Sequence, residues 1–301
     1  MDMMNRIKQL KEEKNAVILA HYYVDADVQA AADFIGDSFY LAKKAAETDA
    51  DKIVFAGVEF MGESAKILNP TKHVYMPDAH ADCPMAHMVT IEKIKEMREK
   101  YDDLAVVCYI NSTAEIKTYS DVCVTSSNAV KIVNKLPNKN IFFVPDQNLG
   151  SYVATQVEGK NIILNNGFCP RHHIMTKEDV LNAKKEHPDA LVAVHPECKP
   201  EVVELADYVG STTGIMNYAK ESDAKEFIIG TENSIVTHLQ MECPDKMFYP
   251  LSKDCVCHNM KATTLTDVLN CCKGIGGLEI NLDEDTRTKA KHCIDEMIRL
   301  G

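Results

Sequence analysis

The sequence predicts an α/β protein made of three α/β/α units, each with a small, mainly parallel sheet, arranged around a pseudo-threefold axis. Short apolar runs alternate with amphipathic helical stretches nearly throughout the chain, which is typical of parallel strands covered on both faces. The residues that follow these strands, and one cysteine, recur three times at a nearly constant spacing: Cys83 and Cys169 are 86 residues apart. Copies of ~87 residues are too long for a solenoid repeat and fit three compact units.

The composition limits the kind of protein this is. The chain has 301 residues, of which 46% are hydrophobic and 26% charged, as in ordinary soluble proteins with a large core. A formal net charge of −12 argues against a nucleic-acid partner, because phosphate neutralisation needs clustered Lys and Arg. No apolar run approaches the ~18 residues of a membrane helix, and the N-terminus lacks the apolar core of a signal peptide. We therefore expect a cytoplasmic protein with no membrane partner.

Two apolar runs in each unit predict buried strands, because they are continuous rather than alternating. They cover residues 16–20 and 52–56, 104–108 and 140–144, and 190–194 and 226–230. A helix is expected over 5–14 before the first strand. Helices starting at Thr90, Thr176 and either Thr263 or Thr264 are expected after each cysteine, with a short strand over 278–282 and a last helix after Asp283.

Three short motifs follow these strands in every copy. The first comprises Ala20–Tyr23, Tyr109–Ser112 and His195–Cys198; the second Ala32–Ser38, Ser120–Ser126 and Ala206–Thr212; the third Gly57–Glu59, Pro145–Gln147 and Gly230–Glu232. The predicted units are residues 1–89, 90–175 and 176–262, with 263–301 as a C-terminal helical extension packing back on them. A single (β/α)₈ barrel is the alternative, but a threefold period does not divide eight strands.

Three cysteines mark one position in the repeat: Cys83, Cys169, and either Cys255 or Cys257, which spacing alone does not separate. Ligands of open parallel sheets collect beyond the carboxyl ends of the strands, so these thiols are expected to converge. Three thiolates suit zinc or an iron–sulfur cluster, although zinc sites usually draw on closely spaced pairs. The alternative is three buried structural thiols. Eleven cysteines in a chain of this kind do not indicate a disulfide framework.

Polar side chains at the same strand ends predict anion binding and proton transfer. Asp37–Ser38, Thr125–Ser126 and Ser211–Thr212 precede helical stretches, where hydroxyls and free N–H groups favour carboxylate or phosphate. Simple N-capping explains any one of them equally well. His21, His195 and Glu197 are candidates for general acid–base catalysis, although a structural role is a common alternative for a strand-end histidine.

These residues together resemble one family over essentially the whole chain. The resemblance is carried by Ile18–Tyr23, Ala32–Ser38, Gly57–Met61, Lys66–Pro70, Cys83–Ala86, Tyr109–Thr113, Thr125–Ala129, Pro145–Gly150, His195–Cys198, Gly210–Thr212, Ile229–Glu232 and Cys257–Lys261. The chain is similar to the quinolinate synthases, the iron–sulfur enzymes of de novo NAD (pyridine nucleotide) biosynthesis.

The resemblance implies a reaction and a cofactor. Iminoaspartate (iminosuccinate) would condense with dihydroxyacetone phosphate to give quinolinate, phosphate and two waters. A [4Fe–4S] cluster would be held by Cys83, Cys169 and Cys257, with one open iron acting as a Lewis acid. The implied partners are these two small substrates and an upstream L-aspartate oxidase or dehydrogenase.

The resemblance also assigns roles within the expected site. Tyr23, Glu197, His195 and Tyr109 would be catalytic, with Tyr23 and Glu197 moving protons. The substrate would be held by His21, Ser38, Tyr109, Asn111, Ser126, His172, His195, Glu197, Ser211 and Thr212. His173 is adjacent to His172 and could take its place. Two other functions are weighed against this one: a non-catalytic iron–sulfur or redox-sensing protein with a reversible Cys255–Cys257 disulfide, and a zinc hydrolase using the same three thiolates.

Overall fold

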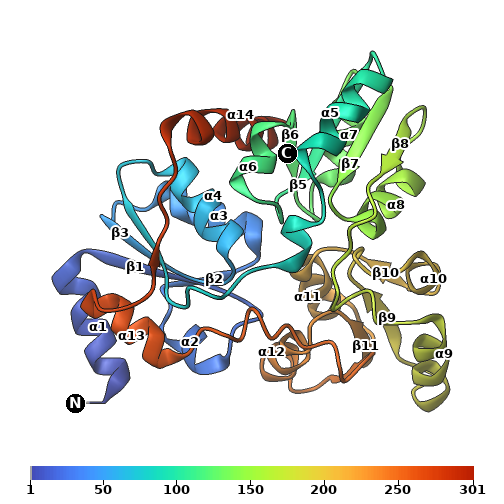
Figure 1. Cartoon of the computed structure of the whole chain (residues 1–301). Coiled ribbons are helices and arrows are strands. Elements are labelled where there is room, and N and C mark those ends of the chain that lie inside the picture. The colour runs from blue at the N-terminus through green and yellow to red at the C-terminus, as the bar shows by residue number, and fades with distance from the viewer. Residues whose placement is uncertain (1) are drawn as a thin grey trace.

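The computed structural model describes residues 2–301 and contains three separate small sheets (Figure 1). The first holds β1 (Ala16–His21), β2 (Phe34–Gly36), β3 (Lys52–Ala56) and β4 (His73–Met76), with β13 (Leu278–Glu279) added at one edge. The second holds β5 (Leu104–Tyr109), β6 (Val122–Val124), β7 (Asn140–Val144) and β8 (Asn161–Leu164). The third holds β9 (Leu191–Val194), β10 (Tyr208–Val209), β11 (Glu226–Gly230) and β12 (Met247–Pro250).

The three sheets share one strand order. It is β2-β1-β3-β4 in the first, β6-β5-β7-β8 in the second and β10-β9-β11-β12 in the third, with every one of these pairs parallel. Only β13 runs antiparallel, against β4. The prediction of three α/β units is confirmed, and the single-barrel alternative is wrong. In each unit the two predicted strands are the two central ones.

Helices connect the strands. They are α1 (Met3–Lys14), α2 (Ala26–Ala31), α3 (Ser38–Glu47), α4 (Glu59–Leu68), α5 (Ile91–Lys100), α6 (Ala114–Thr118), α7 (Ala129–Lys135), α8 (Gln147–Gln156), α9 (Lys177–Glu186), α10 (Pro200–Val203), α11 (Thr212–Glu221), α12 (Ser234–Glu242), α13 (Leu265–Lys273) and α14 (Glu284–Leu300). Thr90, Thr176 and Thr264 cap α5, α9 and α13 through their side chains, and the last two form capping boxes. A Thr cap satisfies backbone N–H groups that the first helical turn leaves free.

The aspartate that recurs in the second motif is a structural link between neighbouring strands. Its side chain accepts the backbone N–H of a residue in the central strand at 2.7–2.8 Å: Ile18 for Asp33, Val106 for Asp121 and Val192 for Asp207. Its own N–H donates to the carbonyl of the same residue. This bond fixes where each short outer strand begins, and with it the residues that follow, among them Ser38, Ser126 and Thr212.

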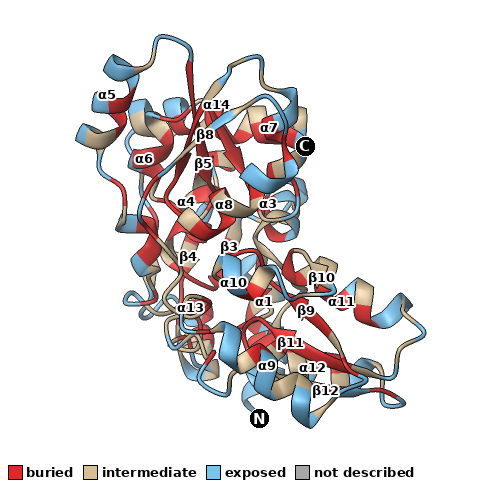
Figure 2. Ribbon diagram, turned by 90° about the vertical axis from the view of Figure 1, so that its right-hand side faces the viewer, coloured by how far each residue is buried: buried red, intermediate tan, exposed pale blue. Residues whose placement is uncertain are grey.

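The helices of the C-terminal segment, α13 and α14, contact elements of the first two units. In Figure 1, α13 lies beside α1, and α14 lies beside α6 and β6. The central strands are coloured buried in Figure 2, so each sheet carries its own share of the apolar core. The unit boundaries at residues 89/90, 175/176 and 262/263 stay a prediction.

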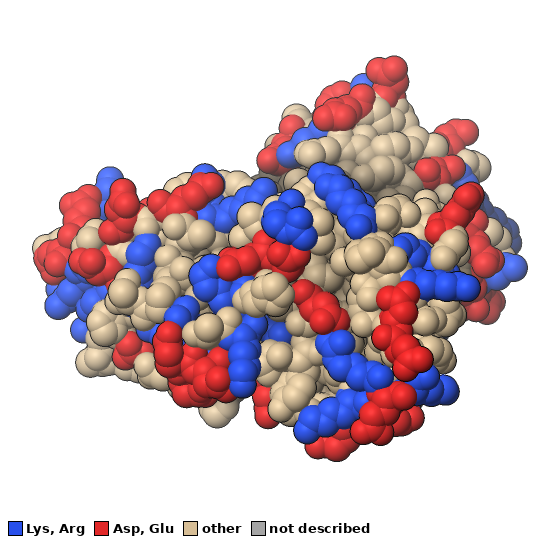
Figure 3. Space-filling view, turned by 90° about the horizontal axis from the view of Figure 1, so that it is seen from above, with Lys and Arg blue, Asp and Glu red and all other residues tan. Residues whose placement is uncertain are grey.

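On the face drawn in Figure 3, acidic and basic side chains are interspersed rather than gathered into large areas of one sign. None of the helices within residues 2–301 has the length and apolar character needed to cross a membrane.

Candidate active site

A cavity of about 100 Å³ lies beyond the carboxyl ends of the central strands and takes residues from all three units. It is bounded by every predicted site residue except Ser211: His21, Tyr23, Ser38, Cys83, Tyr109, Asn111, Ser126, Cys169, His172, His195, Glu197, Thr212 and Cys257. The strand ends thus place side chains far apart in the sequence around one space, which is where parallel sheets bind ligands.

Ser211 has another role. Its Oγ accepts the backbone N–H of Gly214 at 3.1 Å and so caps α11. The neighbouring Thr212 reaches the cavity instead, and its hydroxyl lies 2.7 Å from the Tyr23 hydroxyl. Of His172 and His173, only His172 reaches the cavity, whereas the His173 ring stacks on Phe168 with 4.2 Å between ring centroids.

The three cavity cysteines are presented by the same backbone hydrogen bond. In each unit an N–H just after the second central strand donates to the carbonyl two residues before the cysteine, at 2.8, 2.8 and 3.0 Å. The pairs are Glu59 to Ala81, Gln147 to Gly167 and Asn233 to Cys255. This bond places Cys257 in register with Cys83 and Cys169, while Cys255 is fully buried in the apolar core of the third unit.

The donor set fits an iron–sulfur cluster. Burial, together with the nearby Cys257, raises the pKa of Cys83 to about 12. Burial, Glu197 and the Cys83 thiol likewise raise the pKa of Cys169 well above its usual value. Three neighbouring thiols do not ionise together without a positive centre, and a thiolate-ligated cluster would supply one.

A second group of possible ligand atoms lies in the same place. Cys169 Sγ, a His172 nitrogen and a Glu197 oxygen are within 4.8 Å of one another. These atoms already bind each other, because His172 Nδ1 lies 2.7 Å from Glu197 Oε2 and 3.2 Å from Cys169 Sγ. We therefore interpret this group as a hydrogen-bonded network.

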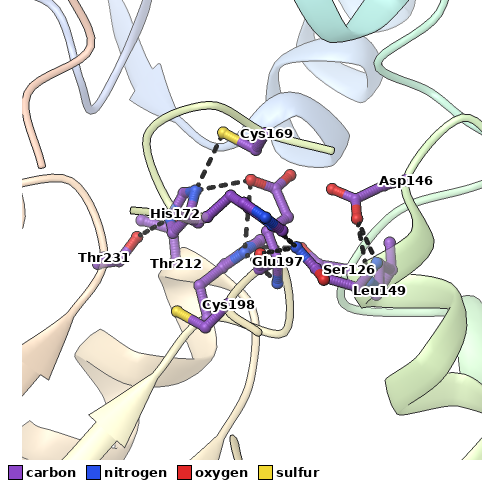
Figure 4. A network of polar contacts seen from close by, with 12 residues as sticks. Ser126, Asp146, Leu149, Cys169, His172, Glu197, Cys198, Thr212 and Thr231 are labelled. Atoms are coloured by element: carbon purple, nitrogen blue, oxygen red, sulfur yellow. Dashed lines mark hydrogen bonds and ion pairs between the residues drawn. The ribbon is translucent and has the colours of Figure 1, made fainter. Parts of the chain in front are cut away.

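Glu197 is the centre of that network (Figure 4). Only 4% of the residue is exposed, the Tyr109 hydroxyl donates to its Oε1 at 2.7 Å, and His172 pairs with its Oε2. Burial opposes ionisation, but the ion pair with His172 and the hydrogen bond from Tyr109 outweigh it and hold the pKa of Glu197 well below its usual value. The carboxylate is therefore ionised in the folded protein.

Thr231 connects this network to Tyr23. Its Oγ1 lies 2.9 Å from His172 Nε2 and 2.9 Å from the Tyr23 hydroxyl, and Figure 4 shows it beside His172. A continuous hydrogen-bonded path therefore runs from Tyr23 through Thr231 and His172 to Glu197. Thr231 lies in the recurring motif Gly230–Glu232, but the sequence alone indicates no role for it, since a buried Thr at a strand end commonly only packs.

The two strand-end histidines are held neutral. His21 Nδ1 accepts the N–H of Tyr23 at 3.2 Å, and His195 Nδ1 accepts that of Glu197 at 3.3 Å. Burial lowers the pKa of His21 to about 4 against the opposing charges of Asp37 and Glu197, and it lowers the pKa of His195 to about 3 against Glu197. Each neutral ring therefore carries its proton on Nε2 as a donor.

These histidines predict a loss of stability in acid. A histidine kept neutral in the fold contributes its full stability above the unfolded pKa of 6.5, and this is lost as the pH falls toward the folded pKa. We expect each ring to cost about 2 kcal/mol of unfolding free energy between pH 7 and pH 5. Urea unfolding at both pH values measures this. Between pH 7 and pH 5 the His21→Gln variant should lose less unfolding free energy than the unchanged chain. The exposed His80→Gln variant should lose as much as the unchanged chain. Equal losses in the two variants would contradict the assignment.

The cavity also offers groups for an anionic ligand. Among the described residues that line it, Arg171 is the one Lys or Arg side chain, and sequence reasoning did not select it. Asn111 Oδ1 is buried without a protein hydrogen-bond partner, so it is available to a donor on a ligand. The wall thus combines hydroxyls, neutral imidazoles, an amide and one guanidinium.

Comparisons with known proteins show the family to which this chain is similar. The family model described as "Quinolinate synthetase A protein" matches residues 5–299. The chain is 55% identical over 299 residues to a quinolinate synthase of Fusobacterium nucleatum, covering 99% of both chains. It is 53% identical over 295 residues to one of Caldicellulosiruptor saccharolyticus, covering 98% of this chain and 97% of the relative. It is 50% identical over 295 residues to quinolinate synthase 2 of Methanosarcina acetivorans, covering 98% and 94%.

Proposed function

The chain belongs to the quinolinate synthase A family and has quinolinate synthase activity, and from this premise we propose how its cavity performs the reaction. Iminoaspartate condenses there with dihydroxyacetone phosphate to give quinolinate, phosphate and two waters. Cys83, Cys169 and Cys257 hold a [4Fe–4S] cluster. The observation that carries the proposal is the presence of these three thiols, one from each unit, in one cavity with a buried acid–base network.

When bound, the cluster supplies an open iron as a Lewis acid toward a substrate oxygen. The reaction involves no net electron transfer, so the remaining work is binding and proton transfer by the chain. His21 and His195 donate N–H groups to substrate carboxylates or phosphate. Ser38, Asn111, Ser126 and Thr212 add hydrogen bonds beside helix N-termini, where anions are favoured.

Glu197 and Tyr23 move the protons. The hydrogen-bonded path allows Tyr23 to take a proton from the substrate as its own hydroxyl proton passes by way of Thr231 to His172 Nε2, with Glu197 stabilising the charged ring. Tyr109, which donates to the same carboxylate, keeps it oriented. The buried position of these groups protects a hydrolysis-prone imine from water.

Thr231 is a positioning residue in this scheme, and a pair of variants tests it. Thr231→Val keeps the shape but breaks the path, so we expect kcat to fall about tenfold or more with KM little changed. Thr231→Ser keeps a hydroxyl and should retain most of the activity. Steady-state kinetics of both variants, with iron content as a control, separate this role from packing; equal activity in Val and Ser variants would contradict it.

Anaerobic purification followed by an assay tests the whole proposal. We expect broad absorbance near ~400 nm from a thiolate-bound cluster, and quinolinate on addition of iminoaspartate and dihydroxyacetone phosphate. A colourless protein containing zinc would overturn the cofactor assignment. We also propose a cytoplasmic location and a supply of iminoaspartate from an L-aspartate oxidase or dehydrogenase, because an imine that hydrolyses readily must be made nearby.

A further inference from the structure

Glu232, in the third motif of the last unit, is a buried carboxylate to which the proposed reaction gives no role. The sequence aligns Glu232 with Glu59, as the third residue of Gly230–Glu232 and Gly57–Glu59. The structure shifts this equivalence by one residue, because Asn233 makes the backbone bond that Glu59 makes in the first unit. Glu232 therefore corresponds to Asp146 in the second unit and to Val58 in the first.

Glu232 is completely buried and binds the loop that carries the third cysteine. Its Oε2 accepts the N–H of Ser234 at 2.8 Å, and its Oε1 accepts the N–H of Cys257 at 3.3 Å. Lys261 Nζ, near the end of the same loop, lies 3.8 Å from Oε1 and donates to Ser234 Oγ at 2.7 Å. The residues after β11 thus hold the loop at both ends of the segment 257–261.

In the other two units the carboxylate near the cysteine loop has different hydrogen-bond partners. Asp146 is also fully buried, accepts the N–H groups of Asn148 and Leu149 at 2.7 and 3.1 Å, and leaves Oδ2 without a partner. In the first unit the side chain of Val58 cannot accept a hydrogen bond. There the N–H of Cys83 donates at 2.7 Å to Asp82, whose side chain is 38% exposed.

A buried carboxylate beside the Cys257 loop carries an electrostatic cost. Lys261 offsets part of this cost through its charge. A carboxylate also accepts a hydrogen bond from a backbone N–H more strongly than a neutral group does. A charged Glu232 would therefore bind the N–H of Cys257 more firmly than a neutral side chain. Groups that hold metal ligands in place commonly control how firmly the metal is retained.

The structure assigns to Glu232 the positioning of Cys257 as a cluster ligand, through its hydrogen bond to the Cys257 backbone. This inference rests on the proposed function. It concerns the retention of the cluster rather than the chemical steps, so Glu232 is a positioning residue and not a catalytic one.

The first test uses the protein without iron. Glu232→Leu removes the acceptor, so the Cys257 thiol should react with iodoacetamide about tenfold faster relative to Cys83 of the same molecule. Mass spectrometry gives both rates, and Glu232→Gln, which keeps an accepting oxygen, should leave their ratio close to that of the unchanged chain. An unchanged ratio in Glu232→Leu overturns the assignment. So does a general rise that includes the buried Cys108, because it would make Glu232 a determinant of folding alone.

The second test uses the protein loaded with iron. In a chelator, Glu232→Leu should release iron about tenfold faster, and Glu232→Gln should release it nearly as slowly as the unchanged chain. Glu59→Leu is the matched control, because only the backbone of Glu59 supports the Cys83 loop, and it should have no effect. Equal rates for Glu232→Leu and Glu59→Leu overturn the inference. If the unchanged chain binds no iron, the proposed cofactor fails, whereas the alkylation ratio still reports on Glu232.

Discussion

The Cys83→Ala variant is expected to purify colourless and to form no quinolinate. Cys83 is the one proposed cluster ligand in the first unit, and the other two proposed ligands, Cys169 and Cys257, belong to the other two units. With two thiolates left, a cluster that needs at least three cannot be retained. Iron and sulfide analysis, absorption spectra and a quinolinate assay measure both losses on one sample.

A second cysteine variant shows whether the loss is specific. Cys243 is half-buried and lies outside the cavity, so Cys243→Ala should keep the absorbance and the activity. Circular dichroism of Cys83→Ala should match that of the unchanged chain prepared without iron. Activity in a Cys83→Ala sample that contains no iron would remove the cluster from the reaction altogether.

The Glu197→Gln variant should keep its cluster and lose turnover. Glutamine preserves the shape and can still accept from Tyr109, but it cannot take a proton or stabilise a charged His172. General acid–base groups typically contribute 10²–10⁴-fold to rate, so we expect kcat to fall by about that factor. The absorbance near ~400 nm should persist, because Glu197 is not one of the three proposed thiol ligands and glutamine preserves its shape.

Glu204 offers a control for Glu197. It is exposed in the same unit, and Glu204→Gln should have normal kinetics. Normal turnover by Glu197→Gln would show that the acid–base assignment is wrong. Loss of iron together with activity would instead make Glu197 a determinant of cluster binding.

The central strands could be predicted because they are continuous apolar runs, such as Lys52–Ala56 and Asn140–Val144, that match the observed strands residue for residue. The short outer strands β2, β6 and β10 could not be predicted from the sequence. β2, β6 and β10 have three, three and two residues, too few for a periodic pattern. They are located by the side chains of Asp33, Asp121 and Asp207, a long-range hydrogen bond that only the folded chain displays.

The site could be predicted in outline for the same reason. Parallel sheets bring strand ends together, so periodic polar residues indicate one cavity. Details that depend on a single hydrogen bond could not be obtained from spacing. The backbone hydrogen bond from Asn233 to the Cys255 carbonyl decides that Cys257, and not Cys255, lies at the cavity. Similarly, Ser211 caps α11, so that Thr212 is the one that reaches the cavity. Thr231 gains its role from contacts with residues distant in sequence.

The origin of the three thiols in three successive units also sets an order of events during synthesis. Cys83 and Cys169 leave the ribosome well before Cys257, and at ~5–20 residues per second the delay is roughly 10 s. Throughout that interval the nascent chain has only two of its three thiols. If the three thiols hold a cluster as proposed, iron can be retained only after residue 257 has emerged and its loop has docked on the turn after β11. On the proposed ligand set, insertion of the cluster is thus a late event that requires the third unit to fold.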